Sequence, residues 1–291
     1  MSGEVLRMEN ITKIYSNGFV ANKDITFWLN EGEILALVGE NGAGKTTLMK
    51  VLFGLENAQS GRVLVQEQEV QIQNTLDAID KGIGMVHQHF MLVPSLTVAE
   101  NVALGIEPMK KGTFDYNKAV EMTREVAEKY NFNIDPKMKV MDLSVGQMQK
   151  VEIMKVLIRG AKIIILDEPT AVLTPQETDE LFEQLILLRK SGHSIIFISH
   201  KLEEVKRICS RVTVLRHGFC LGSYELEDMS EADISRLMVG RDVILRIDKE
   251  QPKPGEVVVH IKNLVNIFSV NKRALPVLRL KIAVRYNIIP N

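Results

Sequence analysis

A glycine-rich segment carries the strongest chemical signal in the sequence. Residues 39–46 (GENGAGKT) match the pattern G-x-x-x-x-G-K-[ST], and they lie between the apolar run Ile34–Val38 and a helical stretch at Thr47–Phe53. A phosphate-binding loop needs this strand–loop–helix context. Glycines let several backbone N–H groups point at one anion, and the helix N-terminus adds positive potential. We therefore predict a phosphate site; the alternative is a chance glycine-rich turn. The predicted contacts are Gly39, Asn41, Gly42, Ala43, Gly44, Lys45, Thr46 and Thr47.

Two adjacent acids end a second apolar run. Asp167 and Glu168 directly follow Ile163–Leu166. Charged side chains at the end of a buried strand cost free energy unless they are paired or bind a metal ion. We expect Asp167 to hold Mg²⁺ through water, next to the hydroxyl of Thr46, and Glu168 to polarise an attacking water. A solvated strand end is the alternative interpretation.

Two polar residues follow other apolar runs and complete the predicted reaction centre. Gln88 follows Ile83–Val86, where its amide could reach Mg²⁺ and the attacking water. His200 follows residues 194–199, within reach of a γ-phosphate, although a structural role for this histidine stays open. The predicted catalytic residues are Lys45, Gln88, Glu168 and His200, and the predicted metal-site residues are Thr46, Gln88 and Asp167.

Two weaker signals concern nucleotide binding. Ser144, Gly146 and Gln147 stand at the start of a predicted helix, whose free N–H groups suit a phosphate held by a partner domain. A plain helix cap is the alternative for this turn. Tyr15 could stack on a purine, or pack against its neighbours as aromatic residues near an edge strand do.

The elements that position these residues alternate between strand and helix. The apolar runs at Ile34–Val38, Ile83–Val86, Ile163–Leu166 and Ile195–Ile198 are apolar on both faces, as in a parallel sheet covered by helices. Leu181, Leu185 and Leu188 repeat at helical spacing, after a helix start at Thr174–Glu177. This alternation predicts an α/β fold.

Taken in order, these segments resemble the ATP-binding cassette family over residues 4–240. In that family they correspond to the adenine-stacking loop (Tyr15), Walker A (Gly39–Thr46), the glutamine loop (Gln88), the signature (143–149), Walker B with its catalytic glutamate, and the switch histidine (His200). The resemblance implies a P-loop NTPase core with a mainly parallel sheet, an antiparallel β subdomain and a helical signature subdomain.

Details of the motifs resemble the bacterial importers of simple sugars and nucleosides, which usually carry two cassettes in one chain. The segments at 86–94 and 168–174 carry this likeness, as do Val145, where many members have glycine, and Thr174, where aspartate is common. The resemblance implies a Mg²⁺-dependent ATP hydrolase on the cytoplasmic face of the membrane. Its implied partners are transmembrane permease subunits, a second cassette arranged head to tail and, indirectly, an extracytoplasmic solute-binding protein. Surface residues 89–95 are the expected permease contact.

Composition and charge restrict the alternatives. Apolar residues make up 45% and charged residues 25% of the 291, which is typical of a globular protein. The 36 Lys and Arg against 37 Asp and Glu argue against a nucleic-acid partner and against a non-transport cassette acting on ribosomes or DNA. No run approaches the ~18 apolar residues of a membrane-spanning helix, and the N-terminus lacks a secretory signal. Cys209 and Cys220 are expected to be reduced thiols.

Changes in composition along the chain predict two domains joined by a linker. We expect a cassette at 1–240, a polar, proline-containing linker at 241–255, and an incomplete second cassette at 256–291. Residues 260–264 resemble 7–11, but no second phosphate loop follows, which suggests a truncated version of a longer chain. A truncated fragment that binds nucleotide but does not support transport is therefore the alternative function. A few strands without covering helices bury too little apolar area to offset ~1–2 kcal/mol of backbone entropy per residue, so we expect this tail to be loosely held.

Overall fold

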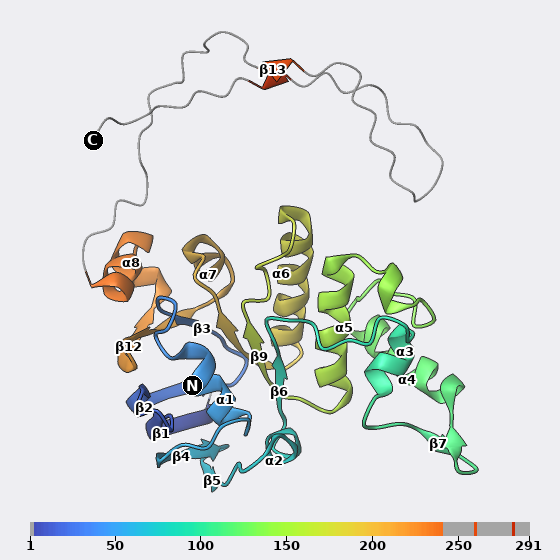
Figure 1. The fold of residues 1–291 in the computed structure, drawn as a ribbon, viewed down its shortest axis with the longest axis horizontal. Coiled ribbons are helices and arrows are strands. Elements are labelled where there is room, and N and C mark those ends of the chain that lie inside the picture. Colours follow the sequence, from blue (N-terminus) through green and yellow to red (C-terminus); the bar gives the residue numbers. More distant parts are fainter. Residues whose placement is uncertain (1–2, 241–258, 261–280, 283–291) are drawn as a thin grey trace. The chain divides into compact units, whose positions relative to one another are not determined.

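The computed structural model describes residues 3–240, 259–260 and 281–282 (Figure 1). The chain divides into two compact units, Met1–Val243 and Ile244–Asn291. In the second unit, β13 (Val259–His260) pairs antiparallel with β14 (Lys281–Ile282). The predicted linker, and apart from these two strands the predicted start of a second cassette, lie outside the described residues.

A central six-stranded sheet forms from the apolar runs identified in the sequence. Its order is β12-β11-β3-β10-β9-β6, and all neighbours are parallel except β11 and β12. The four predicted parallel strands are confirmed. The sheet comprises β3 (Ile34–Val38), β6 (Ile83–Val86), β9 (Ile163–Asp167), β10 (Ser194–Ile198), β11 (Arg211–Arg216) and β12 (Phe219–Glu225).

A second, antiparallel sheet has the order β2-β1-β4-β5 and corresponds to the expected β subdomain. The pairing of β1 with β2 contains several register shifts, which bend and twist the strands. The β7–β8 hairpin lies apart from both sheets. The strands are β1 (Glu4–Ile14), β2 (Val20–Asn30), β4 (Ser60–Val65), β5 (Gln68–Val70), β7 (Met109–Lys110) and β8 (Thr113–Phe114).

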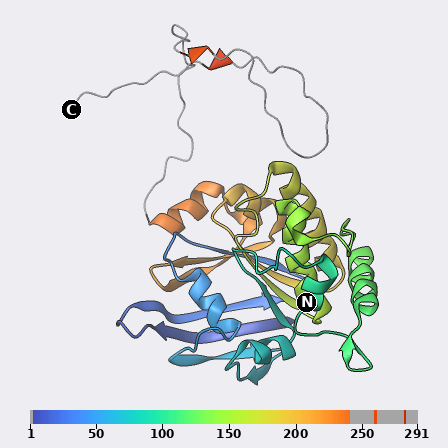
Figure 2. The same cartoon turned by 45° about the vertical axis from the view of Figure 1, so that its right-hand side comes forward.

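Helices cover both faces of the central sheet. Helix α1 lies between the two sheets, whereas α3, α4 and α5 pack on one another and α5 also contacts β6 and α6 (Figures 1 and 2). None of the helices in the described residues combines the length and hydropathy that crossing a membrane requires. The helices are α1 (Lys45–Leu52), α2 (Thr75–Asp80), α3 (Val98–Ala103), α4 (Tyr116–Lys129), α5 (Val145–Ile158), α6 (Pro175–Lys190), α7 (Leu202–Ile208) and α8 (Glu231–Val239).

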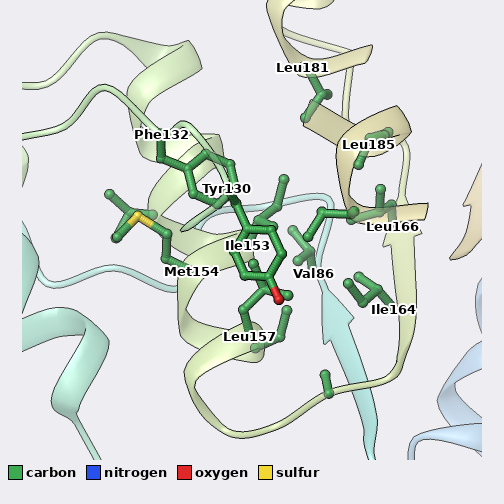
Figure 3. Close-up of a cluster of buried hydrophobic side chains, with 14 of the residues drawn as sticks. Val86, Tyr130, Phe132, Ile153, Met154, Leu157, Ile164, Leu166, Leu181 and Leu185 are labelled. Carbon is green, nitrogen blue, oxygen red and sulfur yellow. The ribbon is translucent and has the colours of Figure 1, made fainter. Parts of the chain in front are cut away.

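The core shows why the central strands are apolar on both faces. Successive side chains of a strand point to opposite sides, so Ile164 and Leu166 of β9 join one buried cluster and Ile163 and Ile165 join another. The second cluster includes side chains from α1, β1 and β2. Figure 3 shows the first cluster, in which strand residues meet side chains of α5, of α6 and of the segment that follows α4. The labelled residues are Val86, Tyr130, Phe132, Ile153, Met154, Leu157, Ile164, Leu166, Leu181 and Leu185.

A buried ion pair joins the two sheets beside this core. Arg211 on β11 donates from Nε and Nη2 to the two carboxylate oxygens of Glu33, each at 2.8 Å, and its Nη2 also donates to the Trp28 carbonyl of β2 at 2.9 Å. The Arg211 and Glu33 side chains are only 5% and 7% exposed. The bidentate geometry satisfies both carboxylate oxygens where water is largely excluded.

Arg211→Met is expected to lower the free energy of unfolding by about 3–5 kcal/mol, because it leaves Glu33 buried without its charge partner. Urea unfolding measures the loss. A double variant, Glu33→Leu with Arg211→Met, removes both charges and should recover part of the stability. A single-variant loss under about 1 kcal/mol, as for an exposed pair, would contradict the assigned role.

Candidate nucleotide site

The loop between β3 and α1 has the backbone geometry that the glycine pattern predicts. Gly44, which precedes α1, has a φ of 100°. A Cβ there would lie 2.4 Å from the Ala21 carbonyl oxygen and 2.5 Å from Asn22 Nδ2. The Asn22 amide also donates to the Gly44 carbonyl at 3.1 Å. Glycine is therefore required both for the left-handed backbone and for the close approach of β2.

Lys45, at the start of α1, spans this loop. Its Nζ donates to the carbonyl oxygens of Gly39 at 2.7 Å and Glu40 at 3.0 Å, and the residue is 6% exposed. Burial lowers the pKa of Lys45, while the nearby charges of Glu168 and Asp167 act in the opposite direction. The ammonium group is thus held among loop atoms, beside the space that phosphates would occupy.

Asp167, the last residue of β9, lies against the same loop. It is 3% exposed, and burial raises its pKa, whereas a hydrogen bond with the Thr46 side chain lowers it. A carboxylate beside a hydroxyl supplies the oxygen donors that Mg²⁺ prefers. The described residues contain no cluster of three or more His, Cys, Asp or Glu side chains suited to a metal. The residues fit a cation that completes its shell with water and phosphate oxygens, as Mg²⁺ usually does.

Glu168 brings the remaining predicted catalytic groups together. One carboxylate oxygen lies 3.3 Å from the Nε2 of Gln88 and the other 3.3 Å from the Nδ1 of His200. The φ of Glu168 is 49°, an unusual value for a non-glycine residue, and its N–H donates to the Ile198 carbonyl of β10 at 3.0 Å. The strained backbone therefore aims this side chain away from the end of β9 toward two other loops.

These groups face one open pocket of about 400 Å³. All four predicted catalytic residues and most of the predicted phosphate contacts line it. The predicted residues that do not line it are Tyr15, Gly39, Ser144, Gly146, Gln147 and Asp167. Two lining residues, Phe19 and Ala21, were not predicted. The complete lining is Phe19, Ala21, Asn41, Gly42, Ala43, Gly44, Lys45, Thr46, Thr47, Gln88, Glu168 and His200.

Glu204, which lies outside the pocket and was not predicted, connects the segments that carry Glu168 and His200. Glu204 on α7 accepts hydrogen bonds from Thr170 Oγ1 at 2.5 Å and Ser199 Oγ at 3.4 Å, and it pairs with Lys201 Nζ at 2.9 Å. Thr170 follows Glu168, and Ser199 and Lys201 flank His200. One carboxylate thus connects the two segments that carry Glu168 and His200. In the sequence, the one feature that could have pointed to Glu204 is its place in the first turn of a helix.

The signature turn caps α5 as predicted, but its donors already have a partner. Ser144 and Gln147 form a capping box. The Oε1 of Glu177, on α6, accepts from Ser144 Oγ and from the Gly146 N–H, both at 3.0 Å. Hydrogen bonds from Thr174, Gly146 and Ser144 hold the pKa of Glu177 below its usual value. The sequence pattern placed Glu177 only in the predicted helix start, where it forms a capping box with Thr174.

The fold and this site define a cassette with a phosphate-binding loop. Residues 22–171 match the family model described as ABC transporter. The chain belongs to this family.

Curated relatives and solved structures agree with this assignment. The chain is 47% identical over 260 residues to the guanosine import ATP-binding protein NupO of Bacillus subtilis, covering 89% of this chain and 51% of the relative. It is 46% identical over 287 residues to the glucose import ATP-binding protein TsgD13 of Haloferax volcanii, covering 89% and 52%. The chain therefore spans about half the length of these relatives.

Among solved structures, an ATP-binding cassette of an ABC transporter in its ADP conformation superposes with a TM-score of 0.70. The two sequences are 26% identical, and the match covers 81% of this chain and 95% of that one. The predicted fold class, a P-loop cassette with a mainly parallel sheet and an antiparallel subdomain, is confirmed.

Proposed function

We propose that this chain binds ATP with Mg²⁺ and hydrolyses the γ-phosphate bond to energise uptake of a nucleoside or simple sugar through a membrane permease. The observation that carries the proposal is the convergence of Gln88 and His200 on Glu168 in the pocket lined by Lys45 and Thr46. Family membership and the import functions named for the relatives support it.

The chemistry follows from the positions of the side chains. Lys45 and the loop N–H groups bind the β- and γ-phosphates. Glu168 accepts a proton from water that attacks the γ-phosphate, and Gln88 and His200, each 3.3 Å from its carboxylate, orient that water and the phosphate. Bound Mg²⁺ would neutralise charge that develops on the phosphates. Thr46, Asp167 and Gln88 are the residues that would hold it.

A second cassette, arranged head to tail, would complete the site in this proposal. Ser144, Gly146 and Gln147 would then face the γ-phosphate bound by the other cassette. An incoming phosphate would replace the Glu177 carboxylate on Ser144 Oγ and the Gly146 N–H. Surface residues 89–95 would contact the permease at the cytoplasmic face of the membrane, with a solute-binding protein outside supplying the nucleoside or sugar.

The rate of ATP hydrolysis per chain, measured against protein concentration, tests the proposal. Pairing of cassettes predicts a rate per chain that rises with concentration and depends on Mg²⁺. Glu168→Gln serves as the background for contaminating hydrolases. If the parent hydrolyses ATP no faster than this variant at any concentration, the chain does not complete a hydrolytic site.

A further inference from the structure

The segment that carries Gln88 connects β6 to α3, and its residues 87–96 lie in neither helix nor strand. Two of its residues, Met91 and Val93, nevertheless have both main-chain polar groups hydrogen-bonded to side chains of neighbouring helices. The side chains of Met91 and Val93 are themselves 60% and 40% exposed. The segment is therefore anchored through its backbone, at alternate residues.

Helix α5 supplies the first anchor. The Met91 N–H donates to Glu152 Oε1 at 2.5 Å, and Lys155 Nζ donates to the Met91 carbonyl at 2.7 Å. Lys155 Nζ also lies 3.2 Å from Glu152 Oε2. The Glu152 and Lys155 side chains are largely buried. Water therefore competes little with these three contacts, which hold both polar groups of the Met91 main chain.

Helix α3 supplies the second anchor. The Oδ1 of Asn101, a fully buried residue, accepts from the Val93 N–H at 2.7 Å, and its Nδ2 donates to the Val93 carbonyl at 3.0 Å. The same Nδ2 donates to the Thr97 carbonyl at 3.0 Å. Arg159, which follows α5, donates to the carbonyl of Leu104, which follows α3. The two anchors thus belong to helices that are joined to each other.

Gln88 lies three residues before Met91, which is at most about 11 Å of extended chain. Its Nε2 lies 3.3 Å from a carboxylate oxygen of Glu168, and both residues line the pocket. Hydrogen bonds weaken steeply as their distance and angle depart from the optimum. A shift of the main chain at Met91 would therefore be passed to the side chain that contacts the proposed general base.

We propose that Lys155 and Glu152 are positioning residues for Gln88, and that Asn101 supports them from α3. The two α5 side chains hold the main chain at Met91 and thereby fix where the Gln88 amide lies relative to Glu168. This inference rests on the proposed function, because it assigns Gln88 a role in hydrolysis. Loss of the anchor should slow hydrolysis and leave ATP binding unchanged, since neither Lys155 nor Glu152 lines the pocket.

Lys155→Met keeps the apolar length of the side chain and removes its donor. Single-turnover hydrolysis at saturating ATP should fall roughly 10- to 100-fold, because displacing a catalytic group by about 1 Å can cost about 100-fold. ATP affinity, measured by calorimetry, should stay within about twofold of the parent. Lys155→Arg keeps a donor and should restore most of the rate. Lys118→Met is the matched control, because it breaks a Lys–Glu pair of the same spacing on α4, between Lys118 and Glu121 at 2.7 Å, and it should change neither quantity.

A double-mutant cycle with Gln88→Ala decides whether Lys155 acts through Gln88. If it does, adding Lys155→Met to Gln88→Ala should lower the rate by less than about twofold. Hydrogen exchange of the Met91 amide, followed by NMR, tests the anchor itself. Exchange should be about 10-fold faster in Lys155→Met than in the parent, while the amides of Ile163–Leu166 stay equally protected.

Three results would overturn the proposal. The first is hydrolysis by Lys155→Met within about twofold of the parent rate. The second is a loss from Lys155→Met that is as large in the Gln88→Ala background as in the parent. The third is unchanged exchange of the Met91 amide. A parent chain that hydrolyses no ATP would contradict the proposed function instead, and the exchange measurement would still decide whether α5 anchors the segment.

Discussion

Glu168→Gln should bind ATP as tightly as the parent and hydrolyse it about 10²–10⁴-fold more slowly. The amide keeps the size of the side chain and can keep a hydrogen bond to a neighbour, but it cannot take a proton from water. In the structure Glu168 is the group on which Gln88 and His200 converge, so neither neighbour can substitute for it without moving. Release of phosphate under single-turnover conditions measures the effect.

Calorimetry on the same variant separates chemistry from binding. ATP affinity within about twofold of the parent shows that the pocket is intact. Glu204→Gln is a second variant to measure, because Glu204 connects the segments that carry Glu168 and His200 but does not line the pocket. If Glu168→Gln hydrolyses ATP within about twofold of the parent, the general base lies elsewhere, and His200 is the first residue to replace.

Lys45→Ala should weaken binding of Mg·ATP by about 100-fold, because hydrogen bonds to charged groups contribute roughly 1.5–3 kcal/mol each. The substitution also leaves the carbonyl oxygens of Gly39 and Glu40 without the donor that now bridges them. Two effects therefore add: the phosphates lose their cation, and the loop loses its internal support. Calorimetric titration with Mg·ATP measures the loss.

Lys50→Ala is the matched control for this prediction. It removes a lysine from the same helix, but Lys50 does not line the pocket, so ATP affinity should stay within about twofold of the parent. An unchanged affinity in Lys45→Ala would rule out the assigned phosphate site.

The central sheet could be predicted because its strands are apolar on both faces. A run such as Ile163–Leu166 is buried on both sides. Asp167 ends the same strand and Glu168 follows it, at the carboxyl end of the sheet. Strand β11 was missed, since it begins and ends with arginine, and Arg211 is buried only because Glu33 pairs with it. Glu33 lies 178 residues before Arg211. The residues around Arg211 therefore give no indication that its charge is paired and buried.

Some residues of the candidate site could likewise be predicted from the sequence, and others could not. Lys45, Thr46 and Glu168 belong to short motifs whose spacing is set by one loop or one strand end, so the sequence identifies them directly. Phe19 lines the pocket and Glu177 contacts the signature turn only because the fold brings together segments that are distant in the sequence. Glu177 satisfies a local capping pattern and also reaches the signature turn 31 residues away at Gly146, a contact that depends on the packing of α6 beside α5.

The contact between the two sheets around Arg211 affects the fluorescence of the protein. Trp28 is the single tryptophan of the sequence. Its ring lies 4.7 Å from the Arg211 guanidinium carbon on the central sheet and 5.6 Å from that of Arg7 on the antiparallel sheet. Tryptophan fluorescence from this protein therefore comes from one place, against two cations whose positions depend on sheet docking. Its emission spectrum reports separation of the β subdomain from the core, and circular dichroism reports the melting of the strands themselves.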